Sequence, residues 1–156
     1  MALRNINSYK KNYILRKKSK YIDEIDKSTL ELIEDMAKTM YKENGVGLAA
    51  LPQVGILKGV IVVDIGKGLI KLINPEIIEQ EGEEQDVEAC LSILGIIGQV
   101  KRPYRVKIKG FNENYENIKI KAIGLLVRAF CHEIDHLNGI LFIDRVVPGI
   151  IRDIAI

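Results

Sequence analysis

The residues best suited to chemistry form the run Cys131-His132-Glu133-Ile134-Asp135-His136. It contains an H-E-x-x-H pattern, and its two histidines are the only ones among the 156 residues. On an α-helix, residues four apart share a face, so both imidazoles can bind one transition-metal ion. The glutamate between them can then take a proton from a water molecule at that ion. The pattern therefore predicts metal-assisted hydrolysis.

The neighbouring residues favour a buried site over an ordinary exposed helix face, where histidine and acidic residues form only weak pairs. Arg128 is the polar exception in a segment whose other members are apolar: Leu125, Leu126, Val127, Ala129, Phe130, Ile134 and Leu137. A helix that is apolar nearly all round is usually buried. Buried ionisable groups need a partner, and a metal ion supplies one.

Two histidines do not complete a catalytic metal site, which takes three protein ligands and leaves a position for water. Because the chain has no third histidine, the third ligand is of another type. The candidates are the thiol of Cys90 upstream and the acids Asp144 and Asp153 downstream. From the pattern alone, Cys90 is either this ligand or a small buried hydrophobe.

Composition predicts one globular domain over residues 1–156, with 47% apolar residues and a net charge of +2. That charge indicates no strong polyanion partner such as DNA. Two cysteines do not make a disulfide framework. No apolar run is long enough to cross a membrane, and the first residues lack the apolar core of a signal peptide. A cytoplasmic protein without a membrane partner is expected.

The first twenty residues hold no acid and seven basic side chains: Arg4, Lys10, Lys11, Arg16, Lys17, Lys18 and Lys20. Such a segment can dock on RNA or a ribosome, or it can be a solvated surface. We favour the solvated surface and keep only weak ribosome proximity as a partner prediction.

Periodicity predicts the elements that must position these residues. A helix is expected over 26–44, with Ser28 and Glu31 as a capping box and Gly45 as the left-handed C-terminal cap. The remaining elements are a buried strand over 59–65, a strand over 69–81 interrupted at Asn74-Pro75, a hairpin of 106–109 with 118–121, and the helix of the H-E-x-x-H pattern over 124–139. Strands followed by one late core helix predict an α+β fold, with antiparallel sheets packed around that helix.

Three segments together resemble peptide deformylases. They are Gly45-Val46-Gly47-Leu48-Ala49-Ala50 followed by Gln53, Glu88-Ala89-Cys90-Leu91-Ser92, and His132-Glu133-Ile134-Asp135-His136-Leu137-Asn138-Gly139. They match, in order, the family patterns G-x-G-x-A-A-x-Q, E-G-C-L-S and H-E-x-x-H, and the likeness extends over most of the chain. The resemblance implies a metal-dependent hydrolase that removes the formyl group from N-formylmethionine at the start of new bacterial polypeptides.

The resemblance also implies roles for single residues. One divalent ion would be bound by Cys90, His132 and His136; iron(II) is expected in the cell, and zinc, nickel or cobalt can occupy the same ligands. Glu133 would act as general base and then as acid toward the leaving amine, while the Leu91 N–H and the Gln53 side chain would hold the formyl oxyanion. The substrate cleft would be lined by Val46, Gly47, Leu48, Ala89 and Arg128. The alternatives are core packing for Val46 and Leu48, a turn at Gly47 and a solvated helix position for Arg128.

The chain departs from the family patterns at both substrate-side segments. Leu51 and Pro52 stand between Ala50 and Gln53, where the family has one residue, and Ala89 replaces a glycine. One added residue in an extended segment turns later side chains to the opposite face unless a bulge absorbs it. We expect a misdirected Gln53, and a bulge that restores its aim is the alternative. The alternatives are a formyl-peptide-binding paralogue with weak or no turnover, and another H-E-x-x-H metallopeptidase with Asp144 or Asp153 as third ligand.

Overall fold

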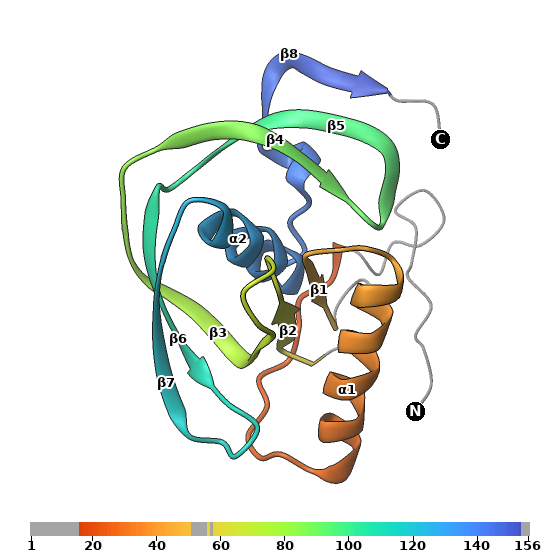
Figure 1. Ribbon diagram of the computed structural model, residues 1–156, viewed down its shortest axis with the longest axis vertical. Coiled ribbons are helices and arrows are strands. Elements are labelled where there is room, and N and C mark those ends of the chain that lie inside the picture. Colours follow the sequence, from red (N-terminus) through yellow and green to blue (C-terminus); the bar gives the residue numbers. More distant parts are fainter. Residues whose placement is uncertain (1–15, 51–55, 57, 154–156) are drawn as a thin grey trace.

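Helix α2 (Leu125–Leu137) lies between two antiparallel sheets (Figure 1). This computed structural model describes residues 16–50, 56 and 58–153. The other elements are α1 (Lys27–Lys42), β1 (Gly47–Ala49), β2 (Val60–Val63), β3 (Ile70–Glu81), β4 (Glu84–Cys90), β5 (Ile93–Arg102), β6 (Arg105–Phe111), β7 (Asn117–Ile123), the 3-10 helix η2 (Phe142–Asp144) and β8 (Val146–Asp153). The strand orders are β1-β2-β3-β6-β7 and β4-β5-β8. The predicted α+β class with a central helix is confirmed.

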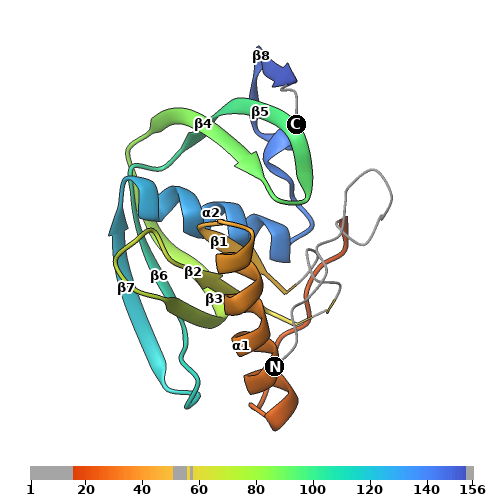
Figure 2. The ribbon, with the colours of Figure 1, turned by 45° about the vertical axis from the view of Figure 1, so that its right-hand side comes forward.

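The five-stranded sheet is covered on both faces, which explains the apolar run of β2. Ile61 and Val63 pack in one core cluster with Phe130 of α2, whereas Val60 and Val62 belong to the cluster of α1. All four residues of β2 are buried, as the run over 59–65 predicts. In Figure 2, β4 and β5 arch over the other side of α2.

The predicted hairpin is formed by β6 and β7. Ile108 pairs with Ile120, and Lys107 pairs with Lys121 on the opposite side of the ribbon. The period of two therefore places apolar side chains toward α2 and lysines outward.

The predicted interruption of β3 is a bulge. Asn74 has φ 52°, and the register with β6 shifts between Ile73 and Glu76. The Asn74 amide accepts from the Ile22 N–H at 2.9 Å and donates to the Ile22 carbonyl at 2.8 Å. The bulge thus ties the segment before α1 to the sheet.

Helix α1 forms as predicted, but both predicted caps are wrong. The N-cap is Asp26, whose Oδ1 accepts from the Thr29 N–H at 2.9 Å and from the Ser28 hydroxyl at 2.9 Å. The carboxylate of Asp26, rather than the hydroxyl of Ser28, caps the helix, and Ser28 lies in the first turn. At the other end Asn44, not Gly45, has the left-handed conformation, with φ 57°, because asparagine also tolerates this region.

Helix α2 begins and ends where the sequence predicts. Its N-cap Gly124 has φ 63° and ψ −129°, and its C-cap is Asn138. Gly139 has φ 73° and packs against the carbonyl of Arg16, while the Ser19 N–H donates to the Leu137 carbonyl at 2.8 Å. No helix in the described part of the chain is long and apolar enough to span a membrane.

Candidate metal centre and active site

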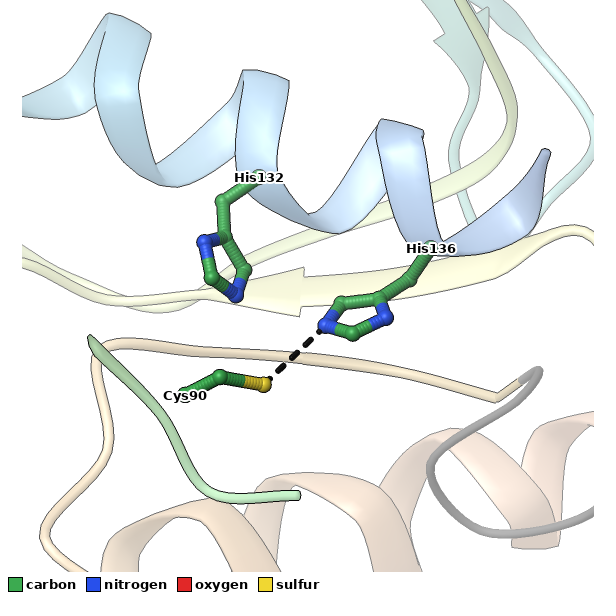
Figure 3. A group of neighbouring side chains, drawn as sticks. All are labelled: Cys90, His132 and His136. Carbon is green, nitrogen blue, oxygen red and sulfur yellow. Dashed lines mark hydrogen bonds between the residues drawn. The ribbon is translucent and has the colours of Figure 1, made fainter. Parts of the chain in front are cut away.

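Three potential metal ligands from two elements converge beside α2 (Figure 3). Cys90 is the last residue of β4, and its Sγ lies 3.2 Å from Nε2 of His136. The candidate ligand atoms of Cys90, His132 and His136 lie within 4.8 Å of one another, and all three residues are buried. Burial lowers the pKa of His136 well below its ordinary value, which keeps its imidazole in the neutral, metal-binding form. A thiolate with two imidazoles fits a tetrahedral zinc or iron(II) site.

Glu88 orients the other imidazole. Residues 88 and 90 alternate with exposed Ala89 on β4, so Glu88 and Cys90 both point toward α2. Oε1 of Glu88 lies 2.9 Å from Nδ1 of His132. Burial alone would raise the pKa of Glu88, but hydrogen bonds from Arg102 and His132 hold it at about 2. Glu88 is therefore a carboxylate at neutral pH, His132 Nδ1–H donates to it, and Nε2 is left for a metal.

A buried ion network continues from Glu88. Arg102 donates to both carboxylate oxygens of Glu88, at 2.8 and 2.9 Å, and to Asp135 Oδ2 at 2.6 Å. Arg145 donates to both oxygens of Asp135. No role for Glu88 was predicted from the sequence, although side chains alternate between the two faces of β4 and Glu88 therefore shares a face with Cys90. Arg102 and Asp135 carry no local signal of this pairing.

Glu133 is buried beside the ligands without a fixed partner. Within the described residues its Oε1 has no hydrogen-bond partner. Burial raises the pKa of Glu133 to about 7, a value that suits exchange of a proton near neutral pH. Gly47 of β1 lies against its carboxylate: a Cβ at position 47 would stand 2.6 Å from Glu133 Oε2. A side chain at position 47 would therefore displace the carboxylate of Glu133, and glycine avoids this clash.

A cavity of about 380 Å³ opens onto these groups. Its wall includes most of the residues predicted to contact substrate or the oxyanion: Val46, Gly47, Ala89, Leu91 and Arg128. Val46 is 47% exposed at its rim. Leu48 does not line the cavity, because its side chain packs in the core cluster of α1. Leu51, Pro52 and Gln53 lie outside the described residues, so the direction of Gln53 stays a prediction.

The alternative third ligand Asp144 is engaged elsewhere. Its carboxylate pairs with Arg16 and accepts from the Leu141 N–H at 3.0 Å. Asp153 ends β8, where it pairs with Ile96 of β5. Across the described ranges, the group of side chains close enough to share an ion is that of Cys90 and the two histidines.

Among known protein families, the family model described as "Polypeptide deformylase" matches residues 3–149 of this chain. The chain belongs to the polypeptide deformylase family. It is 58% identical over 140 residues to the peptide deformylase of Acetivibrio thermocellus, covering 90% of this chain and 82% of the relative. It is 55% identical over 149 residues to peptide deformylase 1 of Clostridium acetobutylicum, covering 96% and 98% of the two chains.

Solved structures of deformylases share the fold. The peptide deformylase of Thermotoga maritima gives a TM-score of 0.89 at 41% identity, covering 94% of this chain and 99% of that one. The enzyme of Synechococcus elongatus, solved in complex with actinonin, also gives 0.89 at 41% identity and covers 94% and 80%. Polypeptide deformylases are metal-dependent hydrolases that remove the N-formyl group from nascent polypeptides, and this chain is an enzyme of that family.

Proposed function

We propose that this deformylase uses Cys90, His132 and His136 as metal ligands and Glu133 as its acid–base residue to release formate from N-formylmethionyl chains. The observation that supports this best is the convergence of three buried ligand atoms within 4.8 Å beside Glu133, whose Oε1 has no hydrogen-bond partner among the described residues. Amide hydrolysis needs an activated water, a stabilised oxyanion and a proton for the leaving amine. The residues around the cavity can meet all three needs.

Each group around the cavity has a proposed role in the reaction. A divalent metal at this site supplies Lewis acidity, which polarises a carbonyl and acidifies water. Glu133, with a pKa of about 7, takes the proton of the attacking water and returns it to the leaving amine. Leu91 follows Cys90 at the tip of the β4–β5 hairpin, and its N–H is proposed to bind the oxyanion. Gln53 is proposed as the second donor.

The substrate backbone is proposed to lie along β1. This strand stands at the end of the described sheet and pairs on one edge with β2. An extended peptide can add to such an edge through main-chain hydrogen bonds. Val46 and Gly47 would then contact the formylmethionyl residue together with Ala89, and Leu48 would act through its backbone.

Iron(II) is the proposed metal in the cell, with zinc, nickel or cobalt as possible occupants of the same ligands. We further propose a single catalytic domain over residues 1–156 and a cytoplasmic location, without DNA or membrane partners. Weak ribosome proximity remains part of the proposal. Arg16 of the basic N-terminal segment pairs with Asp144, and the residues before it lie outside the described ranges.

The test is formate release from a formyl-Met tripeptide by anaerobically prepared iron protein, with the acetylated tripeptide as control. Glu133→Gln should keep the metal and lose about 10²- to 10⁴-fold in kcat, because general acid–base transfer is lost. Glu34→Gln, which changes an exposed acid on α1, is the matched control and should be fully active. Near-normal turnover by Glu133→Gln would refute its role. Tight peptide binding without formate release by the natural chain would instead favour a binding paralogue.

A further inference from the structure

Arg128 is a buried cation at the cavity that the proposed chemistry does not use. It stands four residues before His132 on α2, so both side chains leave the same face of the helix. Its side chain lines the cavity, yet only 7% of it is exposed. A buried guanidinium needs acceptors for its N–H groups. The positions of those acceptors show which groups Arg128 fixes by hydrogen bonds.

The guanidinium donates into the β4–β5 hairpin. Nη1 donates to Glu88 Oε2 at 2.7 Å and to the Val100 carbonyl at 2.9 Å. Nη2 donates to the Glu84 carbonyl at 3.0 Å. These protein contacts use both terminal nitrogens of Arg128, Nη1 and Nη2.

Glu88 carries this contact to the metal site. Arg128 binds Oε2 of the carboxylate, while His132 binds Oε1 at 2.9 Å. Arg102 also binds both oxygens, but it comes from β5 and shares its charge with Asp135. Arg128 therefore adds a second contact from α2 to Glu88, one helix turn before His132. The carboxylate is thus held from α2 at both oxygens, by His132 at Oε1 and by Arg128 at Oε2.

We propose that Arg128 is a positioning residue for the metal site. It holds the Glu88 carboxylate so that Oε1 receives the His132 Nδ1–H and Nε2 keeps its direction toward Cys90 and His136. This inference rests on the metal site proposed above. Groups that orient a metal-binding histidine typically change metal affinity by about 10- to 100-fold when they are removed.

The competing explanation is a purely structural clamp that holds the hairpin to α2 through the carbonyls of Glu84 and Val100. Such a clamp would contribute to thermal stability but would leave His132 unchanged. The two explanations differ in two measurements that do not depend on activity: the zinc dissociation constant and the imidazole N–H signals of the zinc-loaded protein. Because the chain has only two histidines, few such signals need assignment.

The experiment compares the full natural chain with Arg128→Met and Arg128→Lys, each loaded with zinc. Arg128→Met should raise the zinc dissociation constant by about 10- to 100-fold and shift the His132 Nδ1–H signal or speed its exchange. Arg128→Lys keeps the charge with fewer directed donors, so its changes should be smaller. If Arg128→Met does not fold, the same two measurements on Arg128→Lys decide.

Arg105→Met is the matched control, because Arg105 is exposed and pairs with Glu81, outside the ion network of Glu88. It should lower Tm slightly and leave both measurements unchanged. An unchanged zinc constant and an unchanged His132 signal in the Arg128 variants, with only Tm lowered, would overturn the positioning role. Failure of the natural chain to bind zinc tightly would overturn the proposed metal site itself, which is a different result.

Discussion

At the residue scale, the environment of Glu133 depends on a neighbour that has no side chain. Gly47 lies so close that a methyl group there would stand 2.6 Å from Oε2 and 2.9 Å from Cγ of Glu133. Glu133 is 4% exposed, so its carboxylate has little room to move aside. Glu133 and β1 are therefore fitted to each other, and a small change at position 47 would act directly on the proposed acid–base residue.

We predict that Gly47→Ala keeps the metal but lowers kcat by about 10- to 100-fold, because displacement of a reacting group by less than 1 Å is costly. The measurement is formate release together with metal content. Gly45→Ala is the matched control, since its methyl would meet the flexible end of Leu91 at 2.9 Å; it should retain most activity. Equal activity of the two variants would show that Glu133 tolerates displacement.

At the element scale, the start of α1 depends on one carboxylate. Three donors, from Thr29 and Ser28, converge on Oδ1 of Asp26. The Thr29 backbone N–H is the main cause that lowers the pKa of Asp26 to about 2 from its ordinary 3.8. Because the pKa is lower in the folded protein, the stabilisation is complete above pH 4 and is lost as the pH falls toward 2.

We predict that Asp26→Ala lowers Tm by a few degrees at pH 7, whereas Asp26→Asn changes it little, since asparagine also caps helices. Between pH 5 and pH 3 the natural chain should lose more Tm than Asp26→Asn, because only the natural cap titrates. Thermal melts monitored by circular dichroism provide the measurement. Parallel pH curves for the two proteins would contradict the cap's role.

At the scale of the whole molecule, the candidate metal site brings together residues of the three-stranded sheet and of α2. Cys90 belongs to the three-stranded sheet, whereas His132 and His136 belong to α2, whose apolar face packs on the five-stranded sheet. Glu88, Arg102 and Asp135 connect the same layers through ion pairs. An ion at this site would bind the native arrangement and not the unfolded chain, so metal binding and global stability are linked.

We predict that metal removal by a chelator lowers Tm. At free metal of 100 times Kd the linkage is worth about 2.7 kcal/mol, which corresponds to about 5–10 °C for a chain of this size. Cys90→Ala should melt at the same temperature with and without metal. Cys131→Ala, which changes the other buried cysteine, should keep the metal-dependent increase; a Cys90→Ala variant that also keeps it would exclude Cys90 as a ligand.

The sequence by itself determined the features that depend on spacing along one segment. A spacing of four positions places the two histidines on one helix face, and alternation of lysine with isoleucine and valine predicts the β6–β7 hairpin. The bulge at Asn74 and the ends of α2 also follow from local backbone preferences. These preferences are encoded within a few residues, so they can be predicted without knowledge of the rest of the chain.

Only the tertiary structure decided which distant groups meet. From the H-E-x-x-H pattern alone, Cys90 was either the third ligand or a small buried residue, and the fold places its thiol with the two histidines. The pairing of Glu88 with His132 spans 44 residues, and that of Arg128 with Glu88 spans 40. Such contacts depend on how sheets and helices pack, and packing is set by the whole chain rather than by any local pattern.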